Sequence, residues 1–404
     1  MPPADEVTDH LFKTLFENLL DGTGVALDGG RPWDIRVNRR RLYRRALRGS
    51  LGIGEAYIDG DWDCDALDEL FRRVLSSNKL NSPLIRAARG FKVLQSRLVN
   101  LQTRGRSRAV AEEHYDIDHR MYALFLGPWN QYTCCFFDGT GDLEQAEVIK
   151  LEMLCDKLEL KRGDRLLDIG CGWGGFAKYA ASTRGCEVTG ISLSEEQIRY
   201  ATAYTRGLPV AIRRLDYRDL PDSGLGPFDK ISIVGMIEHV GYKNYAELMR
   251  VVHESLKPDG LFLLHTIGNC ERTTVVDPWM EKYIFRNSMA PAMGQLADAA
   301  EGRFVIEDWE NYGHHYVPTL QAWYERFNAN WDRIRALKTA RPFDERFRRM
   351  WNYYLMASKA AFDVEQLHLW QLVMTRRNSG RGVYRRVMQG SAQPVPRELA
   401  RSAR

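Results

Sequence analysis

The chain has 404 residues, and its 44% of hydrophobic and 27% of charged residues are ordinary for a soluble globular protein with two domains. The net charge of +4 is modest, and the longest apolar runs, such as Gly260–His265, are too short to span a bilayer. Seven cysteines without a CxxC pair argue against a disulfide framework or a zinc site, and Met1–His10 lacks the parts of a signal peptide, so we expect a cytoplasmic protein.

Two segments of the N-terminal part are strongly basic. Arg31–Arg48 holds eight arginines and one aspartate, and Arg86–Arg108 holds seven basic residues and no acidic one. Apolar residues recur in the second segment at helical spacing, at Phe91, Leu94, Leu98 and Leu101. A basic amphipathic helix can lie on an anionic membrane surface, and a solvated linker helix explains the pattern equally well. No nucleic-acid-binding motif accompanies the charge, so we expect no nucleic-acid partner.

The shifts in composition predict four parts of the chain. Residues 1–85 form a small mixed α+β domain, and residues 86–111 form a basic helical connector. Residues 112–375 form a large α/β domain, and residues 376–404, rich in Arg, Ser, Gly and Pro, form a flexible basic tail.

The large domain alternates between strands and helices. Strands are predicted at Arg165–Ile169, Cys186–Ile191, Pro209–Arg213, Phe228–Val234 and Gly260–Thr266. Helices are predicted at about 175–184, 194–206 and 242–256, the last closed by Lys257–Gly260. This order predicts a mostly parallel, Rossmann-like sheet flanked by helices, with ligands at the carboxyl ends of the strands. We expect His368–Thr375 to be an added edge strand and the inserted residues 270–365 to be mostly helical.

A glycine-rich turn follows the first of these strands. Asp164–Phe176 reads DRLLDIGCGWGGF, in which a strand turns through glycines into a helix, as in nucleotide-binding turns. The glycines fit DxGxGxG with Asp168 at the strand end, the pattern of class I S-adenosylmethionine-dependent methyltransferases. An NAD-binding domain usually has an acidic residue after its second strand, where this chain has Ser192 and Leu193. We therefore predict that the cofactor is S-adenosylmethionine.

Longer motifs extend the resemblance over about residues 30–375. The segments EEHYDIDHRMYALFLGPWNQYTC, LDIGCGWGG, GISLSEEQ, GMIEHVGYKNY, LLHTIG and DPWMEKYIFRN occur in the order found in cyclopropane-fatty-acyl-phospholipid synthases, and GSLGIGEAYIDGDWDCDALDELF extends the likeness toward the N-terminus. The resemblance implies methylene transfer from S-adenosylmethionine to a cis double bond of a phospholipid acyl chain. It also implies a small N-terminal lipid-binding domain beside the methyltransferase domain.

The resemblance further implies the site residues. Bicarbonate, the base of this family, would be held by Cys134, Glu238, His265, Ile267 through its backbone, and Tyr316. Tyr132 and Thr133 would lie over the methionine end of the cofactor, with Gly170 and Gly172 giving close approach of the backbone. The ribose region would be served by Ser192, Leu193 and Gln197, and the adenine would be flanked by Asp216 and Tyr217. Trp173 would pack against the cofactor or only brace the turn.

A carbocation formed on the acyl chain calls for aromatic faces in a water-poor pocket. The candidates are Tyr132, Phe137, Tyr283, Phe285, Tyr312 and Tyr316, although any single one of them, taken alone, is better explained as a core residue. Ser358 stands where the family typically has a cysteine, which puts in doubt any role assigned to that thiol.

Three alternatives to ring formation remain open on the sequence. The product could be a methyl- or methylene-branched chain without ring closure, the chain could be a catalytically silent lipid-binding protein, or the substrate could be a small molecule. We expect an unsaturated acyl-chain substrate, peripheral association with the inner face of the membrane, and a homodimer.

Overall fold

The computed structural model describes residues 4–77, 118–272 and 276–387, so the predicted connector at 86–111 lies outside the described residues. The chain divides into two compact units. The first unit comprises Met1–Val99, Val275–Arg286 and Leu320–Gln366. The second unit comprises Asn100–Thr274, Asn287–Thr319 and Leu367–Arg404. The domain boundaries drawn from the sequence at residues 85, 111 and 375 stay predictions.

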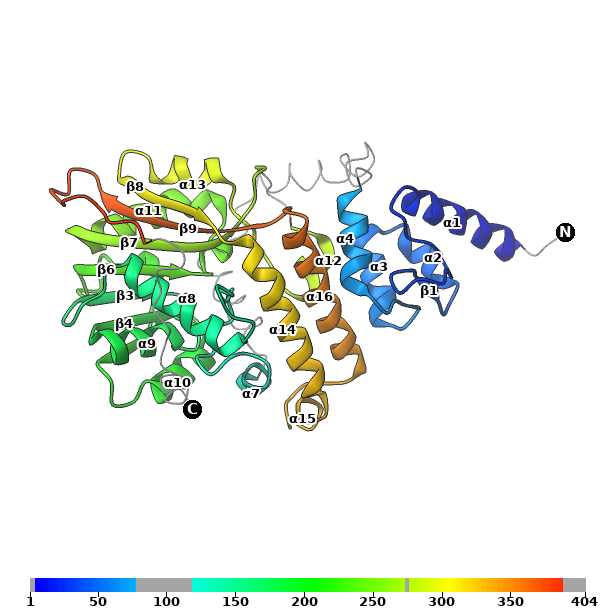
Figure 1. Cartoon of the computed structure of the whole chain (residues 1–404), viewed down its shortest axis with the longest axis horizontal. Helices are drawn as coiled ribbons and strands as arrows, with labels where there is room; N and C mark the ends of the chain where they lie inside the picture. Colours follow the sequence, from blue (N-terminus) through cyan, green and yellow to red (C-terminus); the bar gives the residue numbers. More distant parts are fainter. Residues whose placement is uncertain (1–3, 78–117, 273–275, 388–404) are drawn as a thin grey trace. The chain divides into compact units, whose positions relative to one another are not determined.

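The second unit is built on a seven-stranded sheet in the order β5-β4-β3-β6-β7-β9-β8 (Figure 1). Its strands are β3 (Arg165–Ile169), β4 (Glu187–Ser192), β5 (Val210–Arg214), β6 (Phe228–Val234), β7 (Leu256–Gly268), β8 (Phe304–Asn311) and β9 (His368–Arg376). The five strands from β5 to β7 are parallel, and β9 is antiparallel to both β7 and β8. The predicted mostly parallel α/β sheet is therefore confirmed.

Two details of the sheet differ from the sequence predictions. The strand predicted at His368–Thr375 exists, but the expectation that it lies at the edge is wrong, because β9 pairs with β7 on one side and β8 on the other. The true edge strand, β8, lies in the insert that we expected to be mostly helical. Only Phe304 and Asp308 of its eight residues are buried, so it lacks the apolar alternation that marks a strand. Lys257–Gly260, expected to close a helix, lies inside β7.

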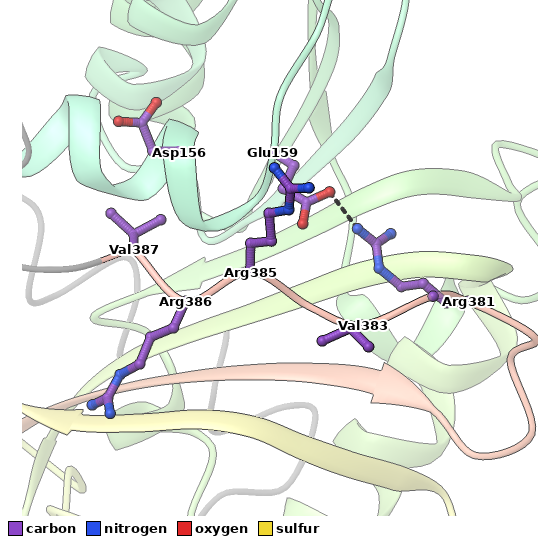
Figure 2. Close-up of a pocket in the computed structure, with 8 residues that line it drawn as sticks. Asp156, Glu159, Arg381, Val383, Arg385, Arg386 and Val387 are labelled. Carbon is purple, nitrogen blue, oxygen red and sulfur yellow. Dashed lines mark hydrogen bonds and ion pairs between the residues drawn. The ribbon is translucent and has the colours of Figure 1, made fainter.

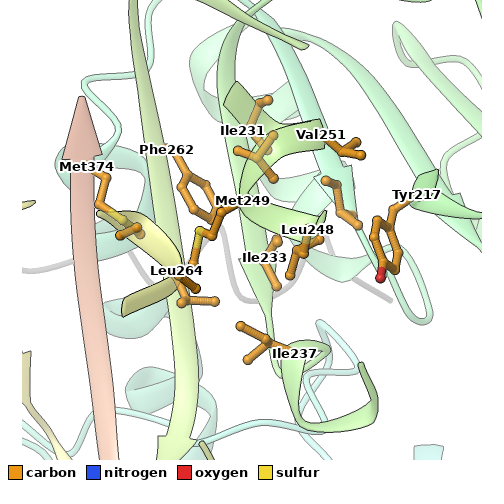
Figure 3. Close-up of a cluster of buried hydrophobic side chains, with 14 of the residues drawn as sticks. Tyr217, Ile231, Ile233, Ile237, Leu248, Met249, Val251, Phe262, Leu264 and Met374 are labelled. Carbon is orange, nitrogen blue, oxygen red and sulfur yellow. The ribbon is translucent and has the colours of Figure 1, made fainter. Parts of the chain in front are cut away.

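Helices cover both faces of this sheet. Alternate residues such as Ile231, Ile233 and Leu264 point into one cluster with Leu248 and Met249 of α11 (Figure 3). On the opposite face of the sheet, the strand residues that alternate with these pack against α8 and α9. They include Leu166, Val188, Leu261 and Leu263. The helices of this unit are α7 (His119–Ala123), α8 (Leu143–Lys157), α9 (Gly175–Arg184), α10 (Glu195–Tyr204), α11 (Tyr245–Ser255) and α13 (Met293–Ala300). Burial on both faces explains why the central strands β6 and β7 are mostly apolar, as over Ile231–Val234 and Leu261–Leu264, whereas the outer strands β5 and β8 carry exposed polar residues.

As far as its residues are described, the first unit is mainly helical, with one short antiparallel pair, β1 (Arg36–Val37) and β2 (Trp62–Asp63). Its helices are α1 (Ala4–Leu20), α2 (Arg41–Ala46), α3 (Gly49–Ile58), α4 (Leu67–Ser76), α12 (Pro278–Tyr283), most of α14 (Tyr316–Ala329), α15 (Trp331–Arg335) and α16 (Glu345–Asp363). Helix α16 packs against α3 and α4, although nearly three hundred residues separate them in the sequence. Tyr353 of α16 contacts the rings of Tyr57, Phe71 and Trp279.

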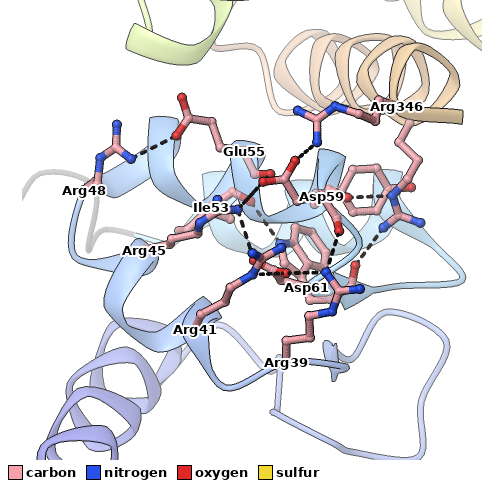
Figure 4. Close-up of polar contacts among 12 residues, drawn as sticks. Arg39, Arg41, Arg45, Arg48, Ile53, Glu55, Asp59, Asp61 and Arg346 are labelled. Atoms are coloured by element: carbon pink, nitrogen blue, oxygen red, sulfur yellow. Dashed lines mark hydrogen bonds and ion pairs between the residues drawn. The ribbon is translucent and has the colours of Figure 1, made fainter. Parts of the chain in front are cut away.

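The arginines of the first unit are largely paired within the fold (Figure 4). Asp61, which is fully buried, accepts hydrogen bonds from Arg41 at 2.6 Å and from Arg45 at 3.1 Å. Asp59 pairs with Arg45 at 2.7 Å and also with Arg346 of α16. The basic segment Arg31–Arg48 is thus held by acidic side chains, and much of its charge serves the packing of this unit.

The C-terminal residues that the structure describes run along the second unit. Tyr384 donates a hydrogen bond to the Lys157 carbonyl at 3.2 Å, Arg386 contacts Asp308 at 3.0 Å, and Arg381 pairs with Glu159. A pocket of about 620 Å³ lies beside this segment and is lined by Asp156 of α8, Glu159 and C-terminal residues that include Arg381 and Arg386 (Figure 2). Arg381 also donates to the Asp259 carbonyl near the start of β7, which places this pocket at the amino ends of the strands. No helix in the described ranges is long and apolar enough to cross a membrane.

Candidate active site

The predicted site residues of the second unit gather where the parallel strands end. The parallel register pairs Asp168 with Gly190 and Ser232, and Val234 with His265, so the ends of β3, β4, β6 and β7 are level. The glycine turn follows β3, Ser192 ends β4, Asp216 follows β5 and Glu238 follows β6. This is the edge at which open α/β sheets bind ligands.

The glycine turn leaves open space for a ligand. Gly170, Gly172 and Gly174 have φ of +79°, +52° and +81°, a region that side chains other than glycine rarely adopt. A Cβ atom added at Gly172 would meet nothing within 4 Å, whereas one at Gly170 would lie 2.6 Å from the Met236 side chain. Gly174 caps the N-terminus of α9. The backbone at Gly172 therefore borders open space next to the N-terminus of α9, an arrangement that suits the binding of a nucleotide-type ligand.

Asp168, at the end of β3, is a buried carboxyl group. It is 2% exposed and accepts a hydrogen bond from the Ser232 hydroxyl at 2.8 Å. Burial raises its pKa to about 6, against the opposing effects of that hydrogen bond and of Lys150. The carboxyl group of Asp168, the acidic residue of the glycine motif, is thus held in place by a side chain of the neighbouring strand β6.

The structure brings the predicted ribose residues together. The Ser192 hydroxyl donates to Gln197 Oε1 at 3.0 Å and accepts from the Ser194 N–H at 3.2 Å. Ser192 and Gln197 are buried, and Leu193 between them is half-buried. After β5, Asp216 is held by the Arg218 backbone and guanidinium, both at 3.0 Å, with Tyr217 buried beside it. The roles of these residues toward a cofactor stay predictions.

Two buried charges of α8 hold the loop that carries Tyr132, Thr133 and Cys134. The Glu147 carboxylate accepts hydrogen bonds from the Trp129 and Gln131 N–H groups, both at 3.0 Å. Lys150 donates to Gln131 Oε1 at 2.5 Å and to Thr133 Oγ1 at 2.8 Å. Both side chains are fully buried, and burial lowers the pKa of Lys150 to about 8. Sequence reasoning missed them, although two charges three residues apart on an apolar helix face were a signal.

An aromatic group surrounds the predicted methionine end. The Tyr132 ring lies 5.0 Å from Tyr122 and 6.4 Å from Phe125 between centroids. Trp173 contacts Tyr122 at 5.8 Å and Tyr200 at 5.5 Å, so it braces the glycine turn against α7 and α10. Sequence reasoning did not single out Tyr122, Phe125 or Tyr200.

Glu238 and His265 each leave one buried polar atom without a partner. Glu238 Oε1 accepts from the Ile267 N–H at 2.8 Å, while its buried Oε2 has no partner among the described residues. Burial raises the pKa of Glu238 to about 7. His265 Nδ1 lies 3.1 Å from Gln371 Nε2, and no described residue offers a partner to the Nε2 atom of His265. Unpaired buried polar atoms are costly, so this pair fits a polar ligand.

Cys134 and Tyr316 belong to two segments that contact each other. Cys134 is fully buried, and burial raises the pKa of its thiol, which stays protonated and donates to the Cys135 carbonyl at 3.3 Å. The Cys135 N–H donates to Thr319 Oγ1 at 3.1 Å, one turn after the buried Tyr316 at the start of α14. The Phe136 ring lies 6.5 Å from His265. The structure thus brings this loop beside His265, and nothing in it makes Cys134 a nucleophile.

The predicted pocket aromatics are divided between the units. Tyr132, Phe137, Tyr312 and Tyr316 lie in the second unit, where Tyr312 stacks on Phe136 at 4.5 Å and donates to Glu310. Tyr283 and Phe285 lie in the first unit, where Tyr283 donates to Glu55 at 3.2 Å and Phe285 meets Tyr354 at 5.6 Å. Ser358 of α16 is also in the first unit. Their grouping around one substrate stays a prediction.

The doubly covered parallel sheet and its DxGxGxG turn define a class I S-adenosylmethionine-dependent methyltransferase, as predicted. The chain belongs to the mycolic acid cyclopropane synthetase family, whose model matches residues 102–372. It is 44% identical over 371 residues to the cyclopropane-fatty-acyl-phospholipid synthase of Escherichia coli (strain K12), covering 92% of this chain and 95% of that one.

Two further comparisons agree. A probable fatty acid methyltransferase of Mycobacterium tuberculosis is 31% identical over 381 residues, covering 85% of this chain and 86% of that one. A crystal structure of the mycolic acid cyclopropane synthase CmaA1 complexed with SAH and CTAB has a TM-score of 0.58 at 26% identity, covering 67% of this chain and 98% of that one. The predicted family, fold and enzyme class are confirmed.

Proposed function

We propose that this chain is a cyclopropane-fatty-acyl-phospholipid synthase, which transfers a methylene group from S-adenosylmethionine to the cis double bond of an unsaturated phospholipid acyl chain. The 44% identity to the Escherichia coli enzyme of that name over 92% of this chain supports the reaction. The structural observation that carries it is the buried pair Glu238 and His265, each with an unpartnered polar atom at the carboxyl edge of the sheet.

The residues at the glycine turn fit S-adenosylmethionine. Open space at Gly172, the paired side chains of Ser192 and Gln197, and the buried Asp216 provide a backbone cradle and polar groups in the predicted order. When bound, this cofactor supplies a methyl group on a positively charged sulfur. Tyr132, fixed by neighbouring rings and by the loop that Lys150 holds, would orient it and exclude water.

The second group that the family implies, bicarbonate, fits the unpartnered atoms. When bound, it supplies a base for the proton that must leave before the ring closes. Glu238 would accept its hydroxyl hydrogen at Oε2, and His265 would contact it through Nε2. The Ile267 N–H holds Glu238 in place at 2.8 Å. Cys134 and Tyr316 would complete the site from the loop and from α14.

The test is incubation of the full chain with S-adenosylmethionine and vesicles of phosphatidylglycerol and phosphatidylethanolamine that carry cis-unsaturated chains. Acyl chains are then released and weighed by mass spectrometry. We expect a gain of one CH₂ per modified chain, and none when a saturated lipid replaces the unsaturated one. Unchanged acyl masses, with cofactor binding verified by calorimetry, would contradict the proposal.

A second product is favoured by one comparison. The Mycobacterium tuberculosis relative is named a probable fatty acid methyltransferase, so a branched chain without ring closure is the alternative. Both products gain the same mass, and proton NMR separates them. Ring closure removes the alkene protons and adds neither a methyl nor an exocyclic methylene signal, whereas branching adds one of the two.

The substrate must be reached at a membrane, and we propose peripheral attachment to its inner face and a homodimeric state. In support, Leu11, Leu15 and Leu19 follow one face of α1 at intervals of four residues and are 57%, 41% and 45% exposed. Sedimentation with anionic vesicles tests attachment, and light scattering in solution tests the dimer. Full recovery of the protein in the supernatant would refute membrane attachment. A scattering mass equal to that of one chain would refute the dimer.

A further inference from the structure

Gln371 lies directly opposite His265 in the ladder between β7 and β9. The two residues are register partners of this antiparallel pair, so their side chains share one face of the sheet. Gln371 is fully buried and His265 is 1% exposed. Gln371 Nε2 lies 3.1 Å from His265 Nδ1. A buried amide therefore contacts the ring nitrogen of His265 that faces away from its unpartnered Nε2.

The contact determines which ring nitrogen carries the hydrogen. The Gln371 amide presents its Nε2 to the ring and leaves its buried Oε1 without a partner among the described residues. An amide nitrogen is only a donor, so in this orientation Nδ1 is the acceptor, and a neutral imidazole then carries its hydrogen on Nε2. Burial, with smaller effects of Lys150 and Lys157, holds the pKa of His265 well below its usual range, so the ring is neutral. Nε2–H is consequently a buried donor without an acceptor in the part of the chain that the structure describes.

We propose that Gln371 is a positioning residue that holds His265 with its hydrogen on Nε2, so that the ring offers an N–H donor to an anion held beside Glu238. The inference rests on the proposed function for the identity of the anion, but the position of the hydrogen does not depend on it. The opposite tautomer would turn a nitrogen lone pair toward the anion, which repels it. A donor aimed at an anion makes a strong, charge-assisted hydrogen bond.

Gln371 was not a predicted site residue, because it belongs to a strand that we expected at the edge of the sheet. The structure places that strand beside β7 and gives Gln371 its contact with His265. The signal available in the sequence was a single polar residue in the run Leu369–Met374, whose other residues are all apolar. The structure buries the whole run, Gln371 included.

The direct test is NMR of the full chain labelled with ¹⁵N-histidine, without ligands. Two-bond ¹H–¹⁵N correlations distinguish the two tautomers, and His265→Asn identifies the signal of this ring among the nine histidines. We expect hydrogen on Nε2 in the parent protein. Gln371→Glu replaces the amide nitrogen with an acceptor oxygen, so the hydrogen should move to Nδ1. Hydrogen on Nδ1 in the parent, or an unchanged pattern in Gln371→Glu, would overturn the inference.

Turnover provides the second readout. We expect kcat to fall at least about tenfold in Gln371→Glu, with an unchanged Kd for S-adenosylmethionine. Gln371→Met, which is of similar size and cannot donate, should show a smaller loss of kcat and mixed tautomers. A tautomer shift without any loss of kcat would overturn the positioning role.

Thr375→Val is the matched control. Thr375 lies on the same strand, is 2% exposed and donates to Glu307 Oε1 at 2.7 Å, away from His265. It should change neither the tautomer nor kcat; a loss equal to that of Gln371→Glu would assign the effect to the strand and overturn the inference. Because the tautomer is measured without reaction, a parent chain that makes no product would contradict the proposed function alone.

Discussion

At the scale of single residues, the burial of Glu238 predicts opposite effects on activity and stability. Its pKa of about 7 in the folded protein lies above its ordinary value of 4.5. Between these pH values the folded state holds a proton that the unfolded state has lost, so the free energy of unfolding falls as pH rises, and the penalty is complete above pH 7. The buried Glu238 carboxylate thus lowers the free energy of unfolding at neutral and higher pH, and a destabilising buried charge of this kind is typical of functional sites.

Glu238→Gln removes this penalty and the acid–base group together. We expect turnover to fall by about 100-fold or more, with an unchanged Kd for S-adenosylmethionine. The free energy of unfolding should rise by about 1–3 kcal/mol at pH 8 and be unchanged near pH 4. Urea denaturation at the two pH values and the acyl-product assay measure these effects. If Glu238→Gln had normal turnover, or were less stable than the parent at pH 8, Glu238 would not be the buried acid–base group that this account requires.

At the scale of elements, helix α8 acts on the site through the loop from Trp129 to Cys135. Lys150→Met deletes two hydrogen bonds to that loop. We expect the Kd for S-adenosylmethionine to rise about tenfold, equivalent to about 1.4 kcal/mol, because Thr133 and Tyr132 lose their support. Calorimetric titration measures it. Lys230→Met is the control, since Lys230 is also buried but lies near the amino end of β6. An equal rise of this Kd in both variants would show that the effect comes from removing a buried lysine and not from the contacts of Lys150 with the loop.

The start of helix α9 depends on a close approach to the same loop. A Cβ atom at Gly175 would lie 1.8 Å from the Trp129 carbonyl oxygen and 2.3 Å from Gln131 Nε2. Alanine favours helices, so any destabilisation by Gly175→Ala comes from this contact. We expect a loss of about 1–3 kcal/mol and weaker cofactor binding. Gly141→Ala, whose Cβ meets nothing within 4 Å, should be neutral. If Gly175→Ala changed neither stability nor cofactor binding, the loop would be able to move away from the added methyl group without cost, contrary to this account.

The elements also show what the sequence could and could not predict. The turn after β3, Ser192 after β4 and Glu238 after β6 were predictable, because each follows its strand directly and parallel strands end together. Gln371 and Lys150 were not, because their partners are 106 and 19 residues away and only the folded sheet brings them near. The edge strand β8 was missed because most of its residues are not buried, so its sequence lacks apolar alternation and its place is set by pairing with β9.

At the scale of the whole molecule, the chain joins a mainly helical unit to a methyltransferase unit, and each contains segments distant in sequence. Most arginines of Arg31–Arg48 are paired with acidic groups, so the exposed leucines of α1 are the better candidates for contact with lipid. The triple variant Leu11→Ser, Leu15→Ser, Leu19→Ser should weaken vesicle binding at least about tenfold. Its Kd for S-adenosylmethionine should not change. Undiminished vesicle binding in sedimentation assays would exclude α1 from membrane contact.

The most direct measurement follows the transferred carbon itself. The full chain is incubated with cis-unsaturated phospholipid vesicles and S-adenosylmethionine labelled with ¹³C in its methyl group, and the product lipid is examined by ¹³C NMR. Cyclopropanation predicts that the label appears as a ring CH₂ and that the alkene carbons disappear in proportion. A labelled CH₃ or exocyclic CH₂, or no label in the lipid, would contradict it.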